Sequence, residues 1–256
     1  MDGQPQPNNM DEQATNDLSV IVDKLKFVLQ NEFEIEITKE VVEFVIEHIY
    51  KGLSWIFKKA NASVDEVGIY IRDFGKTQAS ILNGGNGQVL VINPKVFKQI
   101  DAIFKQAKEA NILAEKLEIT LESEYKEIPK VDCLLPDYLE HIGVEEGTHW
   151  IQELVSNGEN HQGFVKSGEA TRIAVNGDED EEEVLRRYVE GRDHLDEQTK
   201  PHEINAKYWV NEYFKEKYNG KSPWEDFYQA LKKIAEKKNP QKKKLNILKA
   251  FGIGNK

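Results

Sequence analysis

The chain has 256 residues, 39% of them hydrophobic, which is enough to bury a sizeable core in one large domain or two small ones. Its 34 basic and 45 acidic side chains give a net charge of −11, which favours solubility and disfavours general binding to nucleic acid. The single cysteine, Cys133, excludes an internal disulfide and a cysteine-rich zinc site. The sequence shows neither a signal peptide nor an apolar run of the roughly 20 residues that a membrane helix needs. We therefore expect a cytoplasmic protein that does not enter a membrane.

The first part of the chain is expected to be helical after a disordered lead-in. Residues 1–17 are rich in Gln, Asn and Pro and have little to bury. Apolar residues then recur at helical spacing from Leu18 to Leu29, and again after Thr38, which is a suitable N-cap. These two segments form the helical part, residues 18–62, of a single domain that we expect to span residues 18–238.

Three short strands are expected next, in a small antiparallel sheet. The segments rich in β-branched residues are VGIYIRDF (67–74), TQASIL (77–82) and GQVLVIN (87–93). The turn sequence NGGNG separates the second from the third and indicates a hairpin, but it lacks the Gly-Lys-Ser/Thr of a phosphate-binding loop. Pro94 then ends the strand and begins a helix.

Helices are expected to dominate the rest of the chain. One starts at Pro136 (PDYLEHIGVEEGTHWIQELV), one spans Pro201 to Gly220, and one follows Ser222. An acidic run at 178–183 is expected to be a solvated loop, and the lysine-rich tail, 239–256, to be flexible. Helices before and after a small sheet predict the α+β class.

The helix after Pro136 carries a stripe of residue types that bind metals. His141, Glu145, His149 and Gln152 fall on one helical face, and Glu146 flanks it. Residues four positions apart on a helix have Cβ atoms about 5–6 Å apart, so a pair at this spacing can reach one ion. Metalloprotease helices use two ligands at this spacing, with a Glu directly after the first ligand as general base.

This stretch, VEEGTHWIQ, resembles the zincin metallopeptidases, whose mark is H-E-x-x-H followed by a Glu on a later helix. The resemblance places Glu145 at the first His position, Glu146 at the general base and His149 at the second ligand. The segment PHEINAKYW is similar to the P-x-E-I-x-A segment that many small members use, which implies Glu203 as third ligand. The resemblance covers about residues 67–218 and implies a zincin-like part at 63–238 with a peptide or protein substrate.

Glu145 departs from the family pattern, and the departure changes the expected chemistry. Two histidines and one glutamate carry one negative charge, whereas Glu145, His149 and Glu203 carry two and would leave a zinc site near neutral. Such a site should lower the pKa of a metal-bound water less than the usual site does. It should also bind ions that favour oxygen ligands more readily. We expect a divalent metal, with zinc first and manganese or iron as alternatives.

Two functions are consistent with these residues. The first is a metal-dependent peptidase of zincin-like fold with an altered Glu/His/Glu site and Glu146 as catalytic base. The alternative is a catalytically inactive metallopeptidase-like protein, a pseudoenzyme that acts as a protein-interaction module. The residues by themselves also allow an ordinary polar helix face in an unrelated α+β domain, and they leave the oligomeric state open.

Other readings of the same residues are weaker. Di-iron helix bundles also use an E-x-x-H pair, but they need two such pairs and the sequence shows one. His194 and His202 could replace a missing ligand, although surface positions are the simpler interpretation. Gly147 lies inside the helix, where a glycine costs about 1 kcal/mol relative to Ala. We expect that a glycine is present because a neighbouring backbone approaches closely at this position.

Overall fold

The computed structural model describes residues 10–62, 67–75, 77–84, 87–123, 126–156 and 201–238. The acidic run, His194 and the lysine-rich tail fall outside these ranges, as do residues 1–9 of the predicted lead-in. The described chain is α+β, as predicted. It divides into two compact units, residues 1–47 with 67–114, and residues 48–66 with 115–256. Among the described helices, none combines the length and the apolar character that crossing a membrane requires.

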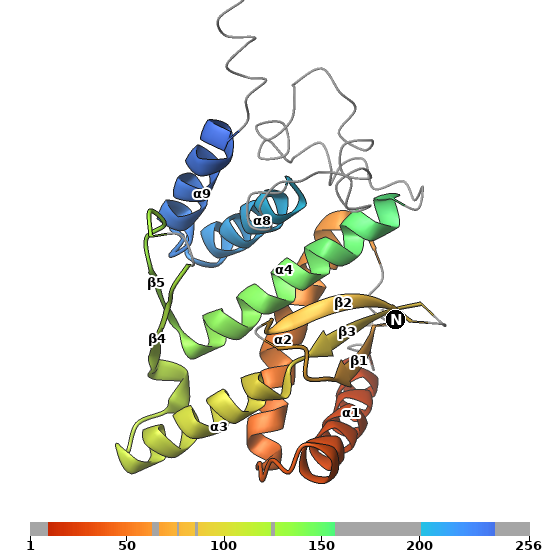
Figure 1. The fold of residues 1–256 in the computed structure, drawn as a ribbon. Coiled ribbons are helices and arrows are strands. Elements are labelled where there is room, and N and C mark those ends of the chain that lie inside the picture. The colour runs from red at the N-terminus through yellow and green to blue at the C-terminus, as the bar shows by residue number, and fades with distance from the viewer. Residues whose placement is uncertain are drawn as a thin grey trace, which may run out of the picture. The chain divides into compact units, whose positions relative to one another are not determined.

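The first unit packs helices around a three-stranded sheet of order β1-β3-β2 (Figure 1). The strands are β1 (Gly68–Ile71), β2 (Ala79–Gly84) and β3 (Gly87–Ile92), and the helices are α1 (Met10–Glu32), the first part of α2 (Lys39–Ala60) and α3 (Pro94–Glu109). The helix α1 thus begins before the predicted Leu18. The predicted hairpin is confirmed, since β2 and β3 pair antiparallel, with Ala79 opposite Ile92.

The strand β1 departs from the expected antiparallel pattern because it runs parallel to β3. The chain between β1 and β2 crosses the end of β3, and the side chain of Asn93 holds it there. Asn93 Nδ2 donates to the carbonyl oxygens of Gly75 and Thr77 at 3.3 and 2.9 Å, while its Oδ1 accepts from Lys95 N at 3.0 Å and caps α3. Gly75 supplies the positive φ, +83°, that this crossing uses.

The second unit contains the predicted metal-binding segments. Its elements are the second part of α2 (residues 48–60), a short 3₁₀ turn ending at Lys116, β4 (Glu118–Leu121), β5 (Val131–Leu134), α4 (Leu135–Ser156), α8 (Pro201–Lys217) and α9 (Glu225–Lys238). The antiparallel hairpin β4–β5 was not predicted, because strands of four residues show too little alternation to be recognised. The strand β5 buries Val131 and Cys133 and leads directly into α4.

Glycines allow the second part of α2 to pass close to α4. A Cβ added at Gly52 would lie 2.1 Å from a carbonyl oxygen of α4, and one at Gly143 would lie 2.0 Å from a carbonyl oxygen of α2. At Gly147 the neighbouring atoms belong to side chains, with Ile56 Cγ2 2.4 Å from an added Cβ. The predicted close approach is therefore present at Gly147, but it involves a side chain rather than the expected backbone.

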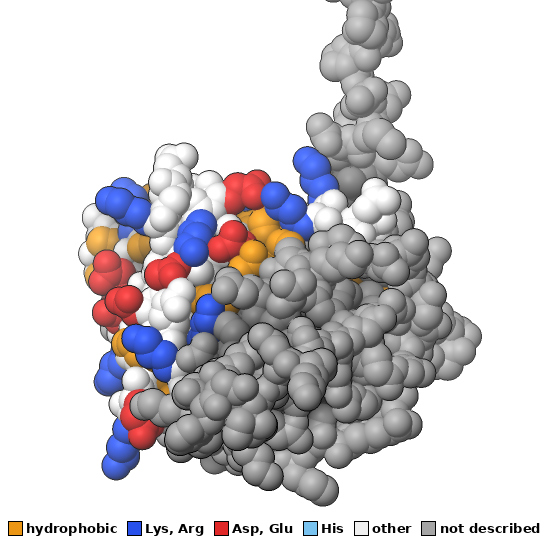
Figure 2. Space-filling model, turned by 90° about the horizontal axis from the view of Figure 1, so that it is seen from above, with side chains coloured by type: hydrophobic (Ala, Val, Ile, Leu, Met, Phe, Trp, Pro, Cys, Tyr) orange, Lys and Arg blue, Asp and Glu red, His pale blue; other side chains and the backbone are white. Residues whose placement is uncertain are grey.

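The helix α8 runs antiparallel along α4, and α9 packs against α8 (Figure 1). This direction follows from the contacts along the pair, since Glu203 faces His149 near one end and Lys217 faces Glu140 near the other. Phe214 and Trp224 stack at 4.3 Å between ring centroids in the core of this unit. On the described part of the face shown in Figure 2, basic and acidic side chains are interspersed with apolar ones.

Candidate metal centre

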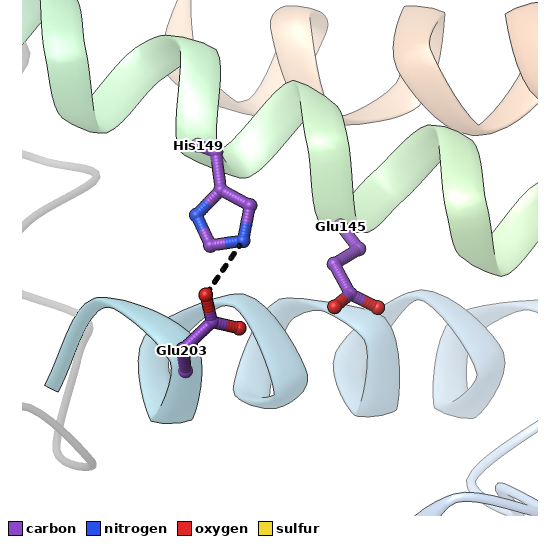
Figure 3. A group of neighbouring side chains, drawn as sticks. All are labelled: Glu145, His149 and Glu203. Atoms are coloured by element: carbon purple, nitrogen blue, oxygen red, sulfur yellow. Dashed lines mark ion pairs between the residues drawn. The ribbon is translucent and has the colours of Figure 1, made fainter. Parts of the chain in front are cut away.

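The helices α4 and α8 bring Glu145, His149 and Glu203 together, each pointing toward the space between the two helices (Figure 3). One ligand atom of each residue lies within 4.8 Å of the other two, and His149 Nε2 is 3.6 Å from Glu203 Oε1. The side chains are 17–20% exposed, so the group is shielded but still accessible to solvent. These three residues are close enough to bind one metal ion.

Gln152 determines which ring nitrogen of His149 faces the group. Gln152 Nε2 donates to the carbonyl oxygen of His202 at 2.9 Å and to Asn205 Oδ1 at 3.0 Å. The amide oxygen of Gln152 therefore faces His149 Nδ1, 2.9 Å away, and this nitrogen carries the hydrogen. Nε2 is left to face Glu203. Metal-bound histidines have this arrangement, in which the other ring N–H donates to an oxygen.

Lys207 also contacts this group, although the sequence analysis did not single it out. Its Nζ is paired with Glu145 Oε2, and the same oxygen lies 3.0 Å from His141 Nε2. Lys207 and Glu145 are only 16% and 17% exposed, so solvent screens this pair less than a surface pair. The signal that could have found it is the four-residue spacing from Glu203, which places both side chains on one face of α8.

Glu146, the predicted general base, follows Glu145 on α4 and is half-buried. Burial is the main reason why the pKa of its carboxyl rises to about 7; His149 opposes the rise, and the carboxylates of Glu145 and Glu203 add to it. A carboxylate with a pKa near neutral pH can both accept and release a proton under ordinary conditions. The local environment is therefore compatible with the predicted role.

The ligand residues are held in their charged forms by one another. Burial alone would raise the pKa of Glu145 and of Glu203, but Lys207 lowers the first and His149 lowers the second. Burial would likewise lower the pKa of His149, yet the carboxylate of Glu203 raises it above its ordinary value. Protonated His149 thus forms an ion pair with Glu203, and an ion that binds at Nε2 must displace that proton.

His202 lies beside the same carboxylate. Its Nε2 is 3.4 Å from Glu203 Oε1, and its ring centroid is 5.7 Å from that of His149. The side chain is 13% exposed, so the surface position expected from the sequence is wrong. His202 is therefore a neighbour of Glu203, and its carbonyl oxygen also holds Gln152.

Sequence reasoning missed a second buried carboxylate on α4, that of Glu140. Its Oε1 is 2.9 Å from Lys51 Nζ and 3.1 Å from His48 Nδ1, while its Oε2 accepts from Tyr213 OH at 2.6 Å and from Lys217 Nζ. Burial alone would raise the pKa of Glu140, but His48, Lys217, Tyr213 and Lys51 together lower it to about 2. Each oxygen of Glu140 thus has two partners and is not available to a further ligand. This cluster has the character of a structural ion-pair network.

Comparisons of the chain with protein-family models, with curated proteins and with solved structures found no match. The interpretation of the site therefore depends on the geometry and donor chemistry of Glu145, Glu146, His149 and Glu203.

Proposed function

We propose that Glu145, His149 and Glu203 hold a divalent metal ion and that the protein is a metal-dependent peptidase of zincin-like type. The observation that carries this proposal is the convergence of one ligand atom from each residue within 4.8 Å. Ligand atoms on a shared zinc ion with bonds of roughly 2.1 Å lie about 3.4 Å apart, so small side-chain rotations would close the site. Two carboxylates and one imidazole suit zinc, and they also suit manganese or iron.

In this proposal the bound ion supplies Lewis acidity, which polarises a peptide carbonyl and makes water easier to deprotonate. Glu146 takes a proton from the attacking water and passes it to the nitrogen of the leaving amine. Gln152 holds His149 with Nε2 directed at Glu203, so the imidazole needs no reorientation to act as a ligand. The substrate is a peptide or a protein.

A second candidate function is an inactive metallopeptidase-like protein that acts as an interaction module. The observation that favours it is the state of Glu145, whose Oε2 is already paired with Lys207 and His141. This carboxylate therefore has partners without any ion, as in a purely structural interhelical contact. In this version the site maintains the packing of α4 against α8 and performs no hydrolysis.

Metal analysis of the purified protein tests the proposal. Chelator-treated protein is incubated with Zn²⁺, Mn²⁺ or Fe²⁺ and desalted, and we expect about one ion per chain, as in a site with three protein ligands. His149→Ala and Glu203→Gln should lose the ion, and Glu146→Gln should keep it. A wild-type protein that stays free of metal contradicts the proposal.

Peptide hydrolysis then separates the two candidate functions. If the protein is a peptidase, Glu146→Gln should lower turnover by about 10²–10⁴-fold while the metal content stays the same. Wild-type protein that binds metal without cleaving any peptide in a degenerate library supports the interaction module instead.

A further inference from the structure

We propose that Lys207 is a positioning residue of the metal centre: it offsets the additional charge of Glu145 and limits that side chain to one coordinating oxygen. The inference rests on the proposed metal centre and identifies the residue that sets its preference among ions.

The contacts of Glu145 divide its two carboxylate oxygens into different roles. Oε2 accepts from Lys207 Nζ and lies 3.0 Å from His141 Nε2. Because the ammonium group of Lys207 occupies Oε2, Oε1 is the atom that an ion can use. Glu145 is thereby a monodentate ligand, like the histidine that would stand at this position in the H-E-x-x-H pattern.

Lys207 also corrects the charge balance expected from the ligands alone. Glu145, His149 and Glu203 by themselves would leave a divalent site near neutral. The ammonium group of Lys207, in contact with Glu145 and only 16% exposed, returns one positive charge. The ion, its three ligands and this lysine then sum to one positive charge. Because Lys207 holds one oxygen of Glu145, each ligand residue offers a single atom, and this low coordination number suits tetrahedral zinc better than ions that take six oxygen ligands.

The helix pairing explains why a lysine can take this role. Glu145 and His149 are four residues apart on α4, and Glu203 and Lys207 are four residues apart on α8, which runs the opposite way. Two contacts therefore lie side by side along one helix interface: His149 with Glu203, and Glu145 with Lys207. An ordinary interhelical ion pair would share this geometry but would have no influence on the choice of ion.

The preference for Zn²⁺ over Mn²⁺ is the measurement that separates these two cases. Competition titrations on metal-free protein should show that Lys207→Met shifts the ratio of the two affinities toward Mn²⁺ by about tenfold. Lys207→Arg keeps the charge and should keep the wild-type ratio. Lys207→Leu likewise removes the donor to Oε2, so it should shift the ratio too, and it serves if the methionine variant fails to fold. Lys215→Met is the matched control, because Lys215 lies on the same helix and forms ion pairs with Glu212 on α8 and Glu225 on α9.

A double variant tests the compensation directly. Glu145→His alone places an imidazole beside Lys207 and His141, and it should weaken Zn²⁺ binding. Glu145→His combined with Lys207→Met removes both the extra negative charge and its compensating cation, and it should restore Zn²⁺ binding at least to the wild-type level. A merely structural ion pair predicts no such rescue.

The outcomes distinguish this inference from the proposed function. Wild-type protein that binds Zn²⁺, with an unchanged Zn²⁺/Mn²⁺ ratio in Lys207→Met and Lys207→Leu, overturns the role of Lys207 and leaves the metal centre intact. If the wild type binds neither ion but Lys207→Met binds one, Lys207 excludes metal, and both proposals fall. Both also fall if neither protein binds an ion.

Discussion

Two carboxylates on the same helix, Glu140 and Glu145, lie in environments of opposite kinds. Glu140 is fully buried and is matched by donors from α2 and α8, two of them lysines. Glu145 is part of a partly exposed group in which three carboxylates face a single lysine, Lys207, and neighbouring imidazoles. A saturated cluster stabilises the packing of helices, whereas a solvent-accessible group of carboxylates, paired in part with an imidazole that can release its proton, is suited to binding a cation.

The largest expected effect is the loss of stability in Glu140→Gln, which is compared with the same substitution at Glu145. Glu140→Gln replaces a fully buried carboxylate that contacts Lys217, His48 and Tyr213, and it should lower the free energy of unfolding by about 3–5 kcal/mol. Glu145→Gln removes the ion-pair partner of Lys207, but this group is partly exposed, so water can replace part of the lost contact and the cost should be smaller, about 1–2 kcal/mol. Urea titration monitored by circular dichroism measures both values. Equal losses would remove the distinction between the two environments.

Acid should abolish the contribution of Glu140. Its pKa is lowered to about 2, so the folded state binds this proton less readily than the unfolded chain, whose carboxyl has the ordinary value of 4.5. The stabilisation is complete above the unfolded value and is lost as pH falls from about 4.5 toward 2, on the order of 3 kcal/mol in total. The difference in stability between wild type and Glu140→Gln should therefore shrink across this window. A difference that stays constant with pH would contradict the assignment.

Metal addition should stabilise the protein through the Glu145 group only. Zn²⁺ at a hundred times its dissociation constant should raise the free energy of unfolding by about 2.7 kcal/mol, because the ion binds the folded chain. Thermal unfolding with and without the ion measures this gain. Glu203→Gln should abolish it, while Glu140→Gln should retain it despite a lower starting stability. A gain of equal size in Glu203→Gln would place the ion elsewhere.

The smallest effect concerns a single donor to Glu140. Tyr213→Phe removes one hydrogen bond at 2.6 Å and should cost about 1–2 kcal/mol, because the two lysines still neutralise the carboxylate and His48 still contacts it. Tyr218→Phe, which removes hydrogen bonds to Asp137 instead, is the matched comparison. Chemical unfolding of the two variants measures the difference. A loss near that of Glu140→Gln would show that the phenol, rather than the lysines, dominates the cluster.

The parts of the fold that depend on local pattern were predictable from the sequence. Helical spacing gave the helices that begin near Pro136 and Pro201, and turn residues gave the β2–β3 hairpin. The parallel pairing of β1 was not predictable, because it depends on the path of the chain past Asn93 rather than on the strand itself.

The candidate site was predictable to the extent that its residues follow a spacing rule. Glu145 and His149 lie four apart on one helix, and the P-x-E segment indicated Glu203. Glu140 gave no such signal: a glutamate within PDYLEHIG resembles any exposed helical residue, and its partner His48 lies 92 positions away in the sequence. Burial of that kind arises only when separate helices assemble.

Gly52 on α2 and Gly143 on α4 let the two helix backbones approach closely, and this approach affects the position of the proposed metal-binding residues on α4. A methyl group at Gly143 would overlap a carbonyl oxygen of α2 and would force α4 to shift as a rigid rod. Glu145 and His149 would travel together and keep their mutual separation, whereas their distances to Glu203 on α8 would change. The hydrogen atom at Gly143 thus sets the position of α4 two residues before Glu145, so a larger residue there should change the affinity of the proposed metal centre as well as the stability.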